Sequence, residues 1–249
     1  MKICSLIILF LSLRAFAFGN SDFEYLPFLD QNVKIGLGLS YSKLESNSNT
    51  GNYYLLSQAN PRVEISYSSP IKDFYRHRFF GSFVLEQFRP ENPTLTIKSG
   101  NDPRASFYIS WEPTWLTESK TFARHFKLAA KNSTVISETP NVFTTQGDIG
   151  DRYSLEAGLG FTWYGLTVSK FPLGLDMEVL YSPTLSSNAT LSVYNGLIYR
   201  MGLDFEFKKK SLFSGWGFRG FYEYEDIKNA QDHFVDKELG IILNRAISF

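Results

Sequence analysis

Two absences narrow what this chain can be: it has almost no cysteine and no long apolar run. Cys4 is the single cysteine among 249 residues, and it lies in a segment that we expect to be removed on export. The mature protein then has no disulfide, no cysteine-based metal site and no thiol nucleophile. After residue 18, no stretch reaches the roughly 18 consecutive apolar residues that a membrane helix needs. The chain is therefore either soluble or crosses a membrane as strands.

An excess of charge of either sign is also missing. Basic and acidic residues number 25 each. Lys2 and Arg14 fall in the expected leader, which leaves 25 − 2 = 23 basic residues in the mature chain. A nucleic-acid-binding protein usually carries a basic patch, so this balance argues against nucleic acid as a partner.

The first residues have the features of a secretory signal peptide. Lys2 supplies the positive charge, Cys4 to Leu13 form an apolar stretch, and Ala15-Phe16-Ala17 matches an A-x-A cleavage site. The apolar stretch is too short for a membrane anchor. We therefore predict that residues 1–17 are cleaved.

The strongest pattern in the mature chain is the alternation of apolar with polar or small residues. From Val33 to Tyr41 every second residue is apolar, and Lys, Gly or Ser stand between. A strand is the regular structure that separates two such sets onto opposite faces. The pattern recurs about ten times, in runs near residues 33–42, 62–68, 78–86, 106–112, 122–129, 152–163, 173–181, 192–207, 215–224 and 238–249.

The two faces of these strands differ in a way that favours a transmembrane barrel over a soluble sheet. The polar face holds Gly, Ser and charges of both signs, whereas the apolar face is continuous and often ends in aromatic residues. Aromatic residues near strand ends are typical of the interfacial girdles of transmembrane barrels. A soluble sheet would turn its apolar face into a shared core, and a lipocalin-like soluble barrel is the alternative fold.

The links between the runs alternate in length. Short links fall at 69–73, 113–119, 169–172 and 208–211, and longer links fall at 45–52, 89–104, 131–151, 183–190 and 227–235. Short periplasmic turns and longer external loops are typical of an up-and-down membrane barrel with an even strand number. We predict one all-β domain over residues 18–249, an antiparallel transmembrane β-barrel of about ten strands. Eight or twelve strands are alternatives, because Pro61 interrupts one run and the run at 122–128 is weak.

The end of the chain carries the most specific motif. Apolar residues alternate up to the last position, at Leu239, Ile241, Leu243, Ile247 and Phe249. This segment resembles the assembly signal of bacterial outer-membrane β-barrels, whose last strand is recognised by the barrel-assembly machinery. Arg245 departs from the pattern, and we expect it to snorkel to an interface or to pair with a glutamate on a neighbouring strand.

The resemblance is to the class as a whole, and it implies several properties. They are an integral location in the outer membrane, contact with outer-membrane lipid and lipopolysaccharide, and insertion through the C-terminal strand. The loops and the polar face match neither the omptin proteases, the outer-membrane phospholipases, the lipid A-modifying barrels nor the large porins. The sequence does not indicate an oligomeric state.

Charged residues dominate the face that we predict to point into the barrel. The basic ones are Lys34, Arg62, Arg76, Arg78, Lys127, Arg152, Arg200 and Arg219, and the acidic ones are Glu64, Glu86, Glu112, Glu156, Asp176, Glu178, Asp204, Glu206, Glu223 and Glu238. A barrel of about eight strands is just wide enough for its own side chains, and an unpaired buried charge is costly. We therefore predict a lumen filled by ion pairs, with a narrow polar pore as the alternative.

The three histidines give weak support for catalysis. His125 lies on the polar face, His77 near a short link, and His233 in a long link with Asp148, Asp151, Asp232 and Asp236 as candidate partners. A hydrolase needs a histidine beside a nucleophile or carboxylate in space, which the sequence does not establish. We assign no catalytic, cofactor-binding or metal-binding residue and no cofactor.

The function that these observations favour is non-enzymatic: a structural, surface-interaction or small-solute transport role. The alternative is an outer-membrane hydrolase or acyltransferase that acts on lipid or peptide at the extracellular rim. The lysines at 208–210 lie in a short turn, where we expect them to be solvated; contact with anionic headgroups is the alternative.

Overall fold

The computed structural model describes residues 31–48, 51–91, 96–97, 102–140, 145–168, 171–187, 195–207, 215–228 and 233–248. The predicted signal peptide at residues 1–17, the lysines at 208–210 and Phe249 lie outside these ranges. Every regular element within them is a strand. A search of the same residues for a helix long and apolar enough to span a membrane finds none.

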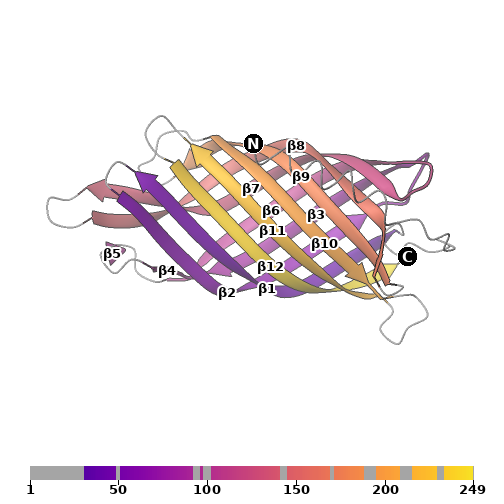
Figure 1. Ribbon diagram of the computed structural model, residues 1–249, viewed down its shortest axis with the longest axis horizontal. Coiled ribbons are helices and arrows are strands. Elements are labelled where there is room, and N and C mark those ends of the chain that lie inside the picture. Colours follow the sequence, from indigo (N-terminus) through magenta and orange to yellow (C-terminus); the bar gives the residue numbers. More distant parts are fainter. Residues whose placement is uncertain are drawn as a thin grey trace.

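Ten long strands form one closed antiparallel barrel (Figure 1). They are β1 (Asn32–Ser48), β2 (Gly51–Ser68), β3 (Tyr75–Glu86), β6 (Arg104–Leu116), β7 (Phe122–Pro140), β8 (Thr145–Val168), β9 (Phe171–Ser187), β10 (Asn195–Glu206), β11 (Trp216–Lys228) and β12 (His233–Ser248), with two short additional strands, β4 (Phe88–Pro90) and β5 (Thr96–Ile97). Each long strand pairs with the next long strand along the chain. The predicted fold class and the strand number of ten are confirmed.

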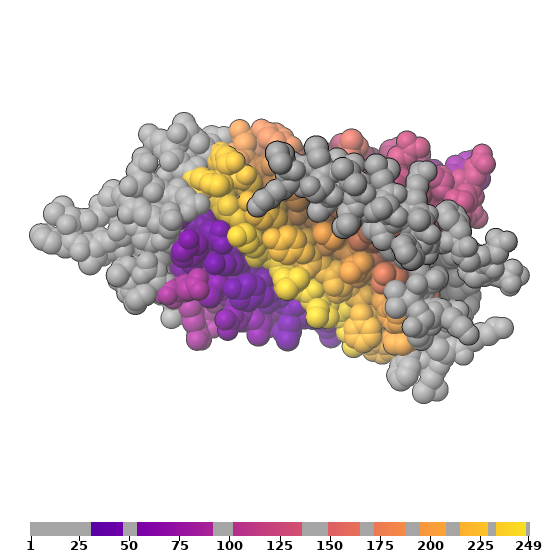
Figure 2. Space-filling model, in the orientation of Figure 1, coloured from indigo at the N-terminus to yellow at the C-terminus, as the bar shows by residue number. Residues whose placement is uncertain are grey.

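The barrel closes where its first and last long strands meet. β1 pairs with β12 along almost its whole length, from Asn32 opposite Ser248 to Asn47 opposite His233. Figure 2 shows these two strands side by side, in indigo and yellow. Closure matters because every backbone group in a membrane must find a partner within the protein, and a closed barrel has no free edge.

Pro61 does not divide its run into two strands. It lies inside β2 opposite Leu39 of β1, and the ladder between β2 and β3 begins at the next residue, Arg62. Pro61 therefore has no partner on β3. Beside it, Ala59 adopts a positive φ of 55°, and the register between β1 and β2 shifts at this level. Beyond the bulge β2 pairs with β4 instead of β3.

The longer links prove to be mostly strand. The link expected at 45–52 shrinks because β1 continues to Ser48 and β2 begins at Gly51. β7 and β8 likewise remain paired as far as Pro140 and Thr145. β8 has 24 residues, whereas a membrane-crossing strand needs about 10. The barrel thus projects hairpins from one end, on the left in Figure 1. The other end carries the links that the sequence predicts to be short, and we refer to it as the end with the shorter turns, although the link from Glu206 to Trp216 is longer than predicted.

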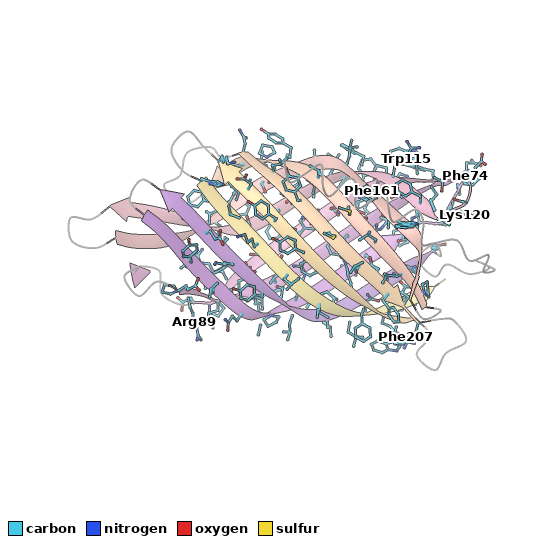
Figure 3. The ribbon with its side chains drawn as sticks, in the orientation of Figure 1. Phe74, Arg89, Trp115, Lys120, Phe161 and Phe207 are labelled. Atoms are coloured by element: carbon cyan, nitrogen blue, oxygen red, sulfur yellow. The ribbon has the colours of Figure 1, made fainter. Side chains whose placement is uncertain are left out.

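The alternation along the strands places apolar side chains outward and charged ones inward. Leu159 and Ile241 are 68% and 67% exposed, whereas Arg152 and Glu156 are each 1% exposed. Figure 3 shows the aromatic side chains of Trp115, Phe161 and Phe207 on the outside of the wall, toward the end with the shorter turns. A wall of exposed leucine and isoleucine with aromatic residues toward its end is what lipid contact requires.

Two apolar clusters lie inside the barrel, one toward each end. Toward the projecting hairpins the cluster consists of Leu44, Leu55, Phe88, Ile149, Ile227 and Phe234. Toward the shorter turns Leu116, Ala123 and Tyr164 pack together, with Ile71 against them. The charged part of the lumen is therefore bounded by apolar side chains on both sides.

Candidate functional site

The side chain of Arg200, on β10, lies at the centre of the charged lumen. Its Nε donates to Glu223 Oε2 at 2.7 Å, and its Nη1 donates to Glu178 Oε2 at 3.1 Å and to the Tyr108 hydroxyl at 2.9 Å. Its Nη2 lies 3.5 Å from Glu156 Oε2. One buried guanidinium thus joins carboxylates from β8, β9 and β11, which are brought together by the closure of the barrel.

The ion pairs continue from Glu223 toward the projecting end. Lys131 Nζ lies 2.6 Å from Glu223 Oε1 and 2.9 Å from Glu225 Oε2. Glu225 Oε1 in turn accepts from Arg152 Nη1 at 2.5 Å, and Arg152 Nη2 donates to the Ser182 carbonyl at 2.7 Å. Arg152 and Glu225 are almost wholly buried, so each depends on the other to compensate for lost hydration.

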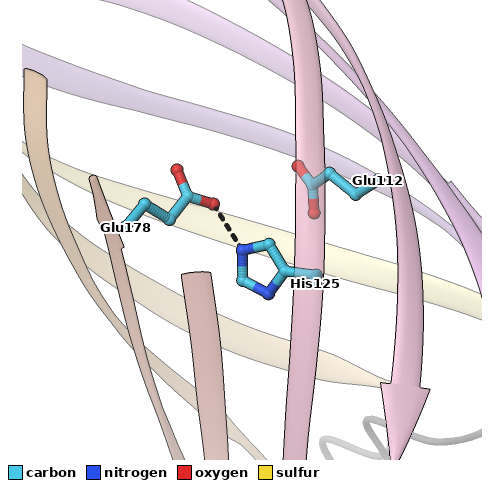
Figure 4. Close-up of side chains that lie close together, drawn as sticks. All are labelled: Glu112, His125 and Glu178. Atoms are coloured by element: carbon cyan, nitrogen blue, oxygen red, sulfur yellow. Dashed lines mark hydrogen bonds and ion pairs between the residues drawn. The ribbon is translucent and has the colours of Figure 1, made fainter. Parts of the chain in front are cut away.

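On the other side of Arg200, a cluster formed by Glu112, His125 and Glu178 has the composition of a metal site (Figure 4). Its ligand atoms lie within 4.8 Å of one another, and His125 Nε2 lies 3.1 Å from Glu178 Oε1. However, the Lys127 ammonium contacts both carboxylates, at 2.9 Å from Glu112 Oε1 and in an ion pair with Glu178. The position that a divalent cation would take is therefore filled by the protein's own cation.

Further ion pairs fill the lumen toward the shorter turns. Arg62 binds Glu64 and Glu238, at 2.8 Å and 2.7 Å, and Arg219 Nη1 lies 3.2 Å from Glu64 Oε2. Lys34 on β1 forms an ion pair with Glu206 on β10, although these two strands are not neighbours in the barrel. Arg76 is buried near the apolar cluster at that end, where its Nη2 donates to the Tyr164 hydroxyl at 2.7 Å.

Little space remains between these side chains. Two interior cavities have volumes of about 50 Å³ and 60 Å³. Each has room for a few water molecules, because a single water needs roughly 10–15 Å³ on this measure. The first is lined in part by Arg62, Tyr108 and Arg200, and the second by Lys34, Tyr164 and Arg219. The described lumen is thus a packed interior with room for a few water molecules.

Every charged residue that the sequence assigned to the lumen faces inward, and the structure adds three that were missed, Lys131, Glu225 and Asp236. Lys131 was missed because it fell at the start of an expected loop, and Glu225 because it followed the end of a run. Asp236 was missed because it was grouped with a loop. All three could have been found by extending the alternation of the neighbouring run by one step, from Lys127, Glu223 and Glu238 respectively.

The candidate histidines do not gather at one site. His77 lies on the outer wall, where its Nδ1 accepts from Trp111 Nε1 at 3.1 Å and its ring packs 4.8 Å from that of Tyr75. His125 is enclosed in the lumen among ion pairs. Neither side chain lies at the rim formed by the projecting hairpins, because His77 and His125 are both near the opposite end of their strands.

The loop group predicted around His233 is not brought together in the described part of the chain. His233 Nε2 lies 2.7 Å from Asp226 Oδ1, and a hydrogen bond from Lys228 to the same carboxylate raises the pKa of Lys228. Asp151 instead pairs with Arg104 at 3.1 Å, and Asp236 lies on the opposite face of β12 from His233. Asp232 and the side chain of Asp148 lie outside the described part.

Comparison with known proteins gives a likeness of fold. No protein-family model matches the chain, and neither does any curated protein sequence. The outer-membrane protease OmpT from Escherichia coli matches with a TM-score of 0.53 and 9% identity, over 88% of this chain and 97% of that one. The COG4313 outer-membrane channel from Pseudomonas putida F1 matches with a TM-score of 0.48 and 8% identity, over 92% and 100%. The chain has the fold of bacterial outer-membrane β-barrels.

Proposed function

We propose that this protein is an integral β-barrel of the bacterial outer membrane, exported by a cleaved signal peptide, whose lumen is a packed core and whose role is structural or surface-interacting. The observation that carries the proposal is the ion-pair network around Arg200, which links β6 to β11 through the middle of the barrel. Its partners are then outer-membrane lipid and lipopolysaccharide around the wall, and the barrel-assembly machinery that recognises the last strand.

The network argues against transport as the main role. A solute that crossed the lumen would have to separate Arg200 from Glu223 and Glu178, and then Lys131 from Glu225. Removing one partner of a buried ion pair costs about 3–5 kcal/mol, so opening several pairs together is far above thermal energy. The apolar clusters toward both ends add a second barrier to ions.

The projecting hairpins support a surface-interaction role. Pairing between β8 and β9 ends at Arg152 opposite Ser187, whereas β8 remains paired with β7 as far as Thr145. β5 adds a short parallel pairing at Gln146 and Gly147. A hairpin that extends beyond its neighbours exposes strand edges, which are ready templates for pairing with another chain.

Reconstitution into planar bilayers tests the closed lumen. We expect the folded protein to insert, as judged by heat-modifiable migration on gels, and to give no stepwise conductance, with a large porin as the positive control. Steady single-channel steps from the wild-type protein would refute the packed-lumen proposal.

Cell fractionation tests the location separately. We expect recovery with the outer membrane, together with lipopolysaccharide. Recovery in the soluble periplasm would refute the membrane proposal and favour a lipocalin-like barrel.

A further inference from the structure

Arg124 is a charged residue on the lipid-facing side of the wall. It is the second outward position of β7, close to the turn between β6 and β7, and its side chain is exposed. Its register partners are Trp115 on β6 and Phe161 on β8, both of which Figure 3 shows on the outside of the barrel toward the end with the shorter turns. No carboxylate in the described part of the chain forms an ion pair with it.

The other outward cations on the described part of the ten long strands are already engaged. Lys43 and Lys237 lie opposite each other toward the projecting end, and Glu45 binds both, at 3.4 Å and 2.7 Å. Arg245, toward the shorter turns, places its guanidinium 5.1 Å from the centre of the Trp216 ring. Arg124 therefore differs from these residues in having a free guanidinium.

An apolar groove begins at Arg124 and crosses the outer wall. It has a volume of about 630 Å³, and its lining includes Phe122, Arg124, Phe161, Met177, Met201 and Tyr222. In the register, Arg124 lies opposite Phe161, Phe161 opposite Met177, Met177 opposite Met201, and Met201 opposite Tyr222. The groove thus runs across five strands in the direction of the hydrogen bonds.

The direction and floor of the groove suit an acyl chain. Arg124 is close to the turn at the start of β7, whereas Tyr222 is well inside β11, so the groove leads from the turn end toward the middle of the wall. Met177 and Met201 are the only methionines after Met1, and both lie in this groove. Methionine side chains are flexible and adapt to ligands of irregular shape.

We propose that Arg124 and this groove form a docking site for an anionic phospholipid of the periplasmic leaflet. The phosphodiester of the headgroup binds the Arg124 guanidinium, and one acyl chain lies along the groove over Met177 and Met201. Arginine is suited to this task because its planar fork of donors matches the geometry of phosphate. The inference rests on the proposed membrane location, since a soluble protein would meet no bilayer.

Quenching of tryptophan fluorescence by brominated lipids tests the site. A Trp216→Phe background removes the tryptophan beside Arg245, so that Trp111, Trp115 and Trp163 report mainly on the Arg124 side. The protein is reconstituted into phosphatidylcholine vesicles that contain a minor fraction of phosphatidylglycerol, with bromine on the acyl chains of one lipid or the other. We expect a local enrichment of phosphatidylglycerol of roughly fivefold, the effect typical of one arginine near an anionic headgroup.

Three variants separate a site from general attraction to charge. Arg124→Gln should abolish the preference for phosphatidylglycerol, whereas Arg245→Gln should retain it; Arg124→Lys should keep part of it. Equal quenching by both lipids in the Trp216→Phe protein, or an undiminished preference in Arg124→Gln, would overturn the site. If the tryptophan fluorescence of the inserted protein were quenched by neither brominated lipid, the site would also be overturned. That result would indicate that a second copy of the protein covers the groove. Failure of all variants to insert would instead refute the membrane proposal.

Discussion

Replacement of Arg200 by methionine tests whether the lumen behaves as a folded core. The change removes the guanidinium but keeps a long side chain, and it leaves Glu156, Glu178 and Glu223 without the cation they share. Removing one partner of a buried ion pair costs about 3–5 kcal/mol. We expect a loss of that size in the free energy of unfolding, measured by urea titration of the barrel in lipid vesicles with tryptophan fluorescence as the signal.

A matched control comes from the outer wall. Lys237 pairs with Glu45 at 2.7 Å but keeps 34% of its side chain exposed, so Lys237→Met should cost less than about 1 kcal/mol. In the described lumen Glu156 has Arg200 as its single ion-pair partner, so adding Glu156→Gln to Arg200→Met should recover part of the loss. Equal effects of Arg200→Met and Lys237→Met would refute the view that the lumen network stabilises the fold.

Three further predictions concern packing, the internal cation and assembly. Gly158→Ala should impair folding on heat-modifiability gels, because its Cβ would lie 2.1 Å from the Val179 carbonyl oxygen, whereas Gly220→Ala should fold normally, because its Cβ would meet nothing within 4 Å. Lys127→Ala should gain a Zn²⁺-dependent rise in the urea midpoint that the wild type lacks, because the three ligands of the lumen cluster remain in place. Deletion of Phe249 should reduce the heat-modifiable form in vivo, and normal assembly of the truncated chain would contradict the role of the last strand.

The faces of the strands could be predicted from the sequence, because the direction of successive side chains in a strand is fixed by the backbone. Glu112, Glu178 and Arg200 were assigned inward from alternation alone, and all three are buried in the lumen. The strand number also followed from counting runs. Pro61 was the main ambiguity, and it is resolved by a bulge at Ala59 that no sequence signal marked.

The pairing of charges could not be predicted in the same way. Arg62 binds Glu238 across 176 positions of sequence, and Lys34 binds Glu206 across 172. Which residues meet depends on the tilt and stagger of the strands around the closed barrel, and alternation does not encode either quantity. The length of the hairpins was missed for a related reason: their backbone ladders continue through polar residues, which give no period of two in hydrophobicity.

The closed lumen has a consequence for where this protein can meet other molecules. Because Arg200 and Lys127 are each bound to more than one carboxylate, these two cations of the lumen are already paired, and little space remains in the interior to hold a ligand. Under the proposed function, we expect recognition to take place on the outside, at the wall or at the projecting hairpins. On the wall, Arg124 combines a free guanidinium with an adjacent apolar groove. Arg124 is therefore informative, because a cation kept at a lipid-facing position of a long strand needs an anion from its surroundings.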